Sequence, residues 1–343
     1  LRIIRKQATR TTETYPTPKR DVGIGLNGVP FYGYKDPESI RYGKLEQIKV
    51  DLRGTGYIRP PFVLIDQVPN KARAILSGQV VESISVDTAD VFPRTPDILI
   101  TSGRNAAVRA VVTGGKVTSL ILDNPGEFYS SPPQIVIRDN AGRGRFAEFE
   151  AVVNTDGQIT GFNKIAEGNF YNQNTIIVDV VPVGSGAVGV PLLKEWNFNR
   201  YRKLESKLDT ENGYVFGNFN NVLEYGYGYT ANPKALRVSL NDNLNNAGTE
   251  PASKSHSPII GFAYDGNPIY GAFGYENPLD STSSIIRMTS SYSINGSRSE
   301  GPDLTNYPIG TFVNDYTYTH KSGTLDENNG RFCITPEFPK GTY

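Results

Sequence analysis

The hydrophobic and polar positions between residues 43 and 186 repeat one pattern four times. Each unit begins at a glycine and continues into a segment in which apolar and polar residues alternate. A loop with an aromatic residue follows, and a second apolar segment ends the unit. Alternation with a period of two is typical of a strand with one buried face. The pattern therefore predicts an array of β repeats with a period of roughly 40 residues, in units that begin at Gly43, Gly78, Gly115 and Gly157.

Residues within the units support this prediction. The alternating apolar pairs are Ile48/Val50, Ile84/Val86 and Leu120/Leu122. The loop aromatics, which we expect to cover one end of each unit, are Tyr57, Phe92, Tyr129 and Tyr171. Prolines precede the second strand, where a missing N–H does least harm; they are Pro60, Pro61, Pro96, Pro132 and Pro133. Apolar residues at 72–75 and 107–110 predict a third strand. Proteins of this kind are all-β, with few short helices.

Long strings of unusual composition flank the array. VGIGLNGVPF spans 22–31, and HSPIIGFAYDGNPIYGAFGYENP spans 256–278. RMTSSY follows at 287–292, then LDENNGRF at 325–332 and TPEFPKGTY at 335–343. These strings resemble the YHYH-domain family, of the type found in structural proteins of T4-like tailed phages that infect cyanobacteria. The resemblance implies a discontinuous domain, opened by residues 1–43, interrupted by the β repeats of 44–190 and completed by 191–343.

The family motif itself is altered in this chain. The stretch 224–233 reads EYGYGYTANP where the family has Tyr-His-Tyr-His. Tyr227 and Tyr229 match the tyrosines, but Gly228 and Thr230 stand at the histidine positions. Glycine offers no ligand, and a threonine hydroxyl is a poor ligand for transition metals. We therefore expect these four residues to form a degenerate motif with a packing role and no catalytic role.

Composition narrows the functional classes further. The 35 basic and 35 acidic residues give a net charge of +0, so no field of one sign favours nucleic acid or an anionic membrane. The chain has only two histidines, His256 and His320, and one cysteine, Cys333. Imidazole and thiolate are the usual ligands of zinc and iron. We expect no cofactor, no membrane insertion and no enzymatic activity.

Acidic residues near the carboxyl end leave one weaker alternative. Asp315, Asp326 and Glu327, with His320 nearby in the sequence, supply oxygen ligands of the kind that Ca²⁺ prefers. Their spacing does not match an EF-hand loop. Asp265 precedes Gly266 in a sequence that is first of all a turn.

These observations favour a virion structural protein of a tailed cyanophage, in the tail, baseplate or fibre, that acts by assembly and surface contacts. Its partners are then copies of itself and other virion proteins, with a host-surface glycan as a further partner. Long β-rich fibre proteins are commonly trimers. A secreted or surface glycan-binding adhesion module is the alternative, and a metal-dependent hydrolase with a degenerate site is the third. The sequence opens LRIIRKQATR without methionine and ends PEFPKGTY, so we expect a fragment of a longer protein.

Overall fold

The computed structural model describes residues 18–216, 226–245 and 247–343. Strands dominate these residues, and the α-helices among them are short, so the expected all-β class is confirmed. The chain forms two compact units. The first unit joins the residues up to Ile40 with Glu195–Tyr343, and the second, which we call the array, is Arg41–Lys194.

The largest sheet of the first unit combines strands from both of its segments. Its order is β16 (Gly213–Phe216), β17 (Gly226–Tyr229), β2 (Pro30–Tyr32), β1 (Asp21–Gly25), β18 (Ile259–Ala263) and β19 (Pro268–Tyr270). Residues 22–31 pair with the segment after the array, because Gly23 lies opposite Ala263 in antiparallel β1 and β18. The two central strands thus come from before the array, so the sheet requires both segments.

Smaller elements complete the first unit. Two hairpin-like pairs join β20 (Phe273–Tyr275) to β21 (Ile285–Arg287) and β22 (Tyr292–Ile294) to β23 (Tyr316–Tyr318). The helical segments are α1 (Arg200–Leu204), η1 (Glu205–Lys207), α2 (Lys234–Ser239) and η3 (Val313–Asp315). No helix among the described residues has the length and apolar character to cross a membrane. Tyr229, Leu236 and Ile260 form an apolar core behind the main sheet.

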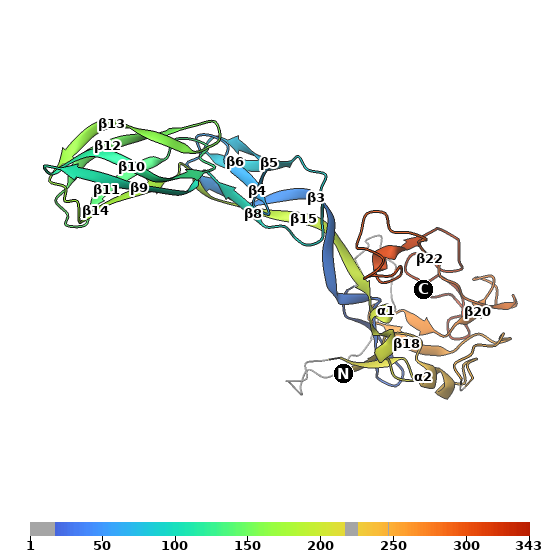
Figure 1. Cartoon of the computed structure of the whole chain (residues 1–343). Helices are drawn as coiled ribbons and strands as arrows, with labels where there is room; N and C mark the ends of the chain where they lie inside the picture. Colours follow the sequence, from blue (N-terminus) through green and yellow to red (C-terminus); the bar gives the residue numbers. More distant parts are fainter. Residues whose placement is uncertain (1–17, 217–225, 246) are drawn as a thin grey trace. The chain divides into compact units, whose positions relative to one another are not determined.

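The array consists of two β modules that lie end to end (Figure 1). The inner module packs the sheet β6-β5-β4-β8 with the sheet β15-β3-β7. The outer module packs the pair β10-β9 with the sheet β13-β12-β11-β14. The inner strands are β3 (Lys35–Thr55), β4 (Phe62–Ile65), β5 (Val68–Ser77), β6 (Val80–Val86), β7 (Val91–Phe92), β8 (Ile98–Thr101) and β15 (Ser185–Asn199). The outer strands are β9 (Arg104–Thr113), β10 (Lys116–Glu127), β11 (Gln134–Asp139), β12 (Arg145–Val153), β13 (Ile159–Asn169) and β14 (Ile176–Val181).

The local predictions for the array are confirmed. Strands β4, β8 and β11 begin just after the predicted prolines, and the expected third strands lie within β5 and β9. The loop aromatics Tyr57, Phe92, Tyr129 and Tyr171 are all buried. Gly157 adopts a positive φ of +75°, as its place in a hairpin turn requires.

The three tyrosines of this set, Tyr57, Tyr129 and Tyr171, have the same packing arrangement. A glycine three residues before each one has φ near +65°, a conformation that costs other residues about 1–2 kcal/mol; the glycines are Gly54, Gly126 and Gly168. A Cβ on Gly168 would lie 2.5 Å from the amide nitrogen of Ala147 and 2.7 Å from the Tyr171 ring. The missing side chain thus lets a neighbouring strand and the ring approach the backbone.

A second glycine, which directly precedes another strand, borders each ring: Gly184 before β15 for Tyr57, Gly103 before β9 for Tyr129 and Gly144 before β12 for Tyr171. The phenol oxygen then accepts a backbone N–H three residues after that glycine. Ala147 donates to Tyr171 over 3.3 Å, and Ala187 donates to Tyr57 over 3.1 Å. Because Tyr57 and Ala187 are 130 residues apart, this bond joins the beginning of the array to its end.

We expect Gly168→Ala to destabilise the protein by about 3 kcal/mol, from left-handed backbone strain plus overpacking against Ala147 and Tyr171. Gly142→Ala is the matched control, because Gly142 also has a positive φ, of +72°, but no atom lies within 4 Å of its added Cβ. It should cost only about 1 kcal/mol. Urea unfolding of both variants measures the difference, and equal costs would contradict the close-packing argument.

The turn between β11 and β12 should make stability pH-dependent. Asp139 accepts a hydrogen bond from the Thr175 hydroxyl and from the amides of Gly144, Ala141 and Arg143, which lowers the pKa of this carboxyl from 3.8 to about 2. A depressed pKa stabilises the fold above about pH 4, and this contribution is lost as the pH falls to about 2. The unfolding free-energy difference between the wild type and Asp139→Asn should therefore shrink over that range. A difference that is independent of pH would contradict this.

Candidate functional site

The motif strand β17 directs its tyrosines into hydrogen bonds with the chain itself. The Tyr227 hydroxyl donates to Asp209 over 2.7 Å, and burial together with this bond raises the pKa of Tyr227, so the phenol stays protonated. Asp209 also accepts the amide of Gly213, which closes the turn before β16. Tyr229 is buried, and its hydroxyl accepts from the Asn27 amide over 3.0 Å. Both side chains are therefore engaged within the first unit.

The space beside Gly228 is filled by an aromatic cluster. A Cβ on Gly228 would lie 2.3 Å from the Tyr32 ring. That ring stacks on Phe216 with 4.0 Å between centroids, and the guanidinium of Arg200 lies 4.9 Å from the Tyr32 centroid. Arg200 is 1% exposed, and its Nη2 donates to the Lys19 carbonyl. An imidazole at position 228 would displace this cluster, so the strand has no room for one family histidine.

Thr230 occupies the second histidine position of the family motif. The Thr230 amide donates to the Asn212 carbonyl over 3.3 Å. This bond extends the pairing of β17 with β16 by one residue. The Thr230 hydroxyl oxygen is buried and has no hydrogen-bond partner among the described residues. Glu224 and Tyr225, at the start of the aligned stretch, lie outside the described residues. The four motif positions thus offer two engaged phenols, one packed glycine and one buried hydroxyl.

Asp315, the first predicted calcium ligand, is used by the fold. Its carboxylate receives two bonds from Arg298, of 2.7 and 2.5 Å, and the amides of Gly310 and Phe312. It is only 1% exposed. Arg298 in turn donates to two backbone carbonyls and lies over the ring of Trp196. These contacts occupy the carboxylate with an internal ion pair.

The other two acidic residues lie together in a turn. Asp326 accepts the amides of Asn328 and Gly330, and Tyr343 donates its hydroxyl to Asp326 over 2.6 Å. Glu327 contacts the Tyr318 hydroxyl through its side chain. Within 18–216, 226–245 and 247–343, no three His, Cys, Asp or Glu side chains gather closely enough to hold a metal ion. The structure therefore does not bring the three predicted ligands into one site.

The histidines and the cysteine have separate surroundings. His256 contacts the rings of Tyr270 and Tyr275, and its Nδ1 lies 2.8 Å from the Ser257 carbonyl oxygen. His320 is exposed beside Tyr318. Burial raises the pKa of the Cys333 thiol, which therefore stays protonated at neutral pH. The charged group that acts on the thiol is Arg331, which lowers its pKa by less than burial raises it.

Sequence reasoning missed a buried ion network near α2. Arg237 donates to Asp242 over 2.5 Å and to Asn232 over 2.9 Å. Glu250 bridges Arg237 to Arg287. Burial alone would raise the pKa of Glu250, but the hydrogen bonds from the two arginines lower it. No local pattern identifies these residues, because they are distributed over 56 positions and meet only in the folded chain.

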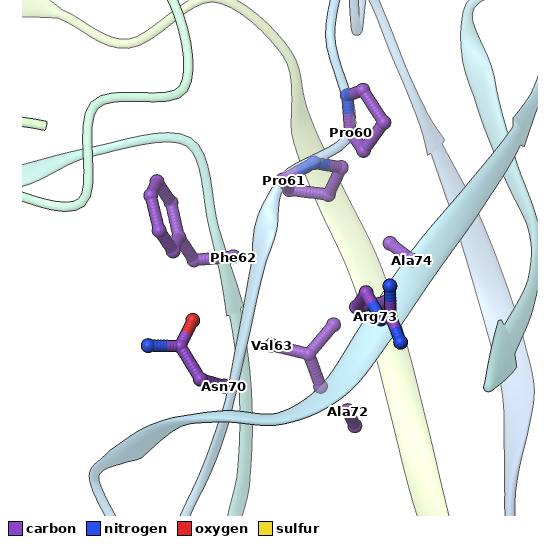
Figure 2. Close-up of a pocket in the computed structure, with 8 residues that line it drawn as sticks. All are labelled: Pro60, Pro61, Phe62, Val63, Asn70, Ala72, Arg73 and Ala74. Atoms are coloured by element: carbon purple, nitrogen blue, oxygen red, sulfur yellow. The ribbon is translucent and has the colours of Figure 1, made fainter. Parts of the chain in front are cut away.

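The array carries a shallow cavity of about 260 Å³ on the inner module (Figure 2). Prolines and aliphatic side chains from β4 and β5 form most of its lining, and Asn70 and Arg73 add polar groups. Arg73 already pairs with Asp87 over 2.7 Å. A cavity with one engaged cation and few converging polar groups suits packing of an apolar surface better than chemistry.

We expect Gly228→Ala to destabilise the protein by about 1–3 kcal/mol, because the new methyl group would overlap the Tyr32 ring. Gly226→Ala on the same strand is the control, since the nearest atom is 3.9 Å from its added Cβ. That change should be neutral or slightly stabilising. Thermal or urea unfolding measures both, and a tolerated Gly228→Ala would show that the cluster can move aside.

Comparison with known proteins identifies the family of this chain. No curated protein and no solved structure matches the chain. The family model described as YHYH protein matches residues 166–343, which is just over half of the chain. This match includes the altered motif strand, the network around Arg237 and all of the first unit after the array. The chain therefore belongs to the YHYH protein family.

Proposed function

We propose that this YHYH protein is a structural component of a tailed-phage virion, in the tail, baseplate or fibre, and acts by assembly and not by catalysis. The construction of the array carries the proposal. Two β modules lie end to end in one compact unit, and the ring of Phe128 packs on Phe62 at the junction, with 5.4 Å between centroids. Stacked modules of this kind suit spacers and scaffolds.

The first unit supports the same proposal from its polar groups. The charged side chains that it buries are engaged with one another, as in the Arg298–Asp315 and Arg237–Asp242 pairs. The motif tyrosines bond to Asp209 and Asn27 of the same unit. Polar groups used in this way stabilise a fold and leave little for a reacting substrate.

We further infer that the β repeats interrupt the YHYH domain. The main sheet draws β1 and β2 from before the array and β18 from after it. An insertion at a loop with neighbouring ends has this form. The phages of cyanobacteria, suggested by the family strings, are the expected source, and the expected partners are copies of this chain and other tail proteins.

Exposed aromatic rings favour one second candidate, a glycan-binding module. Phe146 is 77% exposed and Phe170 is 71% exposed, both in the outer module. Rings of this kind can stack on sugars, as they do in many saccharide sites. A host-surface glycan would then be the ligand, and the array would present the rings to it.

The virion proposal is tested by particle composition. We expect mass spectrometry of gradient-purified particles to detect this chain in a fixed ratio to other tail proteins, because an assembled component co-purifies with the particle. A phage replication protein is the control and should be removed by the same gradient. A chain that stays in the soluble or cell-surface fraction would overturn the proposal and leave the glycan-binding alternative.

A further inference from the structure

The two ends of the outer module are built alike. At the inner end, Gly126 is followed by Phe128 and Tyr129; at the outer end, Gly168 is followed by Phe170 and Tyr171. Both phenylalanines have a positive φ, of +61° and +64°. The two rings lie at opposite ends of the module: Phe128 follows the end of β10, whereas the amide of Tyr171, next to Phe170, donates to the Gly115 carbonyl just before the start of β10.

Only one of these ends is covered within the array. Phe128 packs on the Phe62 ring of the inner module, and Arg104 lies over Phe128 at 5.3 Å while its Nη1 donates to Gln67. Phe170, in the equivalent position, is 71% exposed. The same local structure therefore forms a module contact at one end and an open surface at the other.

A second aromatic ring lies at the open end. Phe146 is 77% exposed and has φ +67°, next to Arg145. The corresponding residue at the covered end is Asn105, with φ +64°. Around Tyr57 of the inner module, Gly56 occupies the position that matches Phe170, and Gly186 occupies the position that matches Phe146. Glycine adopts this backbone without strain, so the strained phenylalanines indicate a role for the rings.

The charges at the open end also differ from those at the covered end. Arg104 pairs with Glu127 over 2.9 Å, but Asn169 takes the place of that acid beside Arg145. Arg145 forms no salt bridge in the part of the chain that the structure describes, and its Nε lies 3.5 Å from the Arg143 carbonyl. A guanidinium without an acid is available to lie over an aromatic ring, as Arg104 does.

We propose that this outer end, formed by Arg145, Phe146, Asn169 and Phe170, is a docking surface for the same end of a second copy of this chain. In a two-fold contact, Phe146 of each copy faces Phe170 of the other, as Phe62 of the inner module faces Phe128, and Arg145 lies over the Phe170 ring of its own copy, as Arg104 lies over Phe128. A contact between two such ends is smaller than the roughly 1,000 Å² of a stable interface, so association is weak alone and strengthened by multivalency. This inference deepens the proposed assembly function and rests on it.

Sedimentation velocity of the full chain over a wide concentration range tests the proposal. We expect reversible self-association that Phe146→Gly with Phe170→Gly abolishes. Because these changes remove backbone strain and no buried contact, the unfolding midpoint should not fall. Phe128→Gly is the matched control: it removes a covered ring, so it should lower the unfolding midpoint and leave self-association intact.

Two results would overturn the docking surface. One is a wild-type chain that stays monomeric over the whole concentration range. A monomeric chain that binds a soluble β-glucan such as laminarin through the two rings counts as the same result. The other is self-association that persists unchanged in the double glycine variant, which would place the contact elsewhere. Detection of the chain in purified particles is independent of both results, so the assembly function and this surface can fail separately.

Discussion

The ring of Tyr57 lies between Gly54 and Gly184, two backbone segments that are far apart in the sequence. Its hydroxyl accepts the Ala187 amide, which holds the end of β3 against the start of β15. The two strands continue side by side, so Arg41 reaches the Leu193 carbonyl within the array. The chain therefore returns close to where it departed, and the segments on either side of the array can share one sheet.

Packing of aromatic rings against glycine recurs in both units. Tyr171 packs against Gly144 in the array, and Tyr32 against Gly228 and Trp196 against Gly301 in the first unit. A ring placed over a glycine restores the contact area that the missing side chain removes, and it brings neighbouring backbones together. The same device explains the altered motif. Once the Tyr32 ring occupies the space beside position 228, a histidine there has no room.

Buried arginines form the second structural theme. Arg298 and Asp315 each form several hydrogen bonds, and Arg237 forms ion pairs with Asp242 and Glu250. Removal of one partner from such a buried pair typically costs about 3–5 kcal/mol, because the other charge is left unpaired. Charged residues that look like ligands in the sequence thus hold loops of the first unit together. Two highly exposed aromatic rings, Phe146 and Phe170, lie on the array instead.

The sequence by itself determined the β class, the strand starts after prolines and the burial of the loop aromatics. These properties depend on residues a few positions apart, whose alternation and turn preferences act locally. Only the tertiary structure decided that Gly184 is the partner of Tyr57, that Arg298 saturates Asp315, and that Phe128 is covered whereas Phe170 is open. Phe128 and Phe170 have the same local sequence pattern, so their different exposure depends on which distant strands close around them.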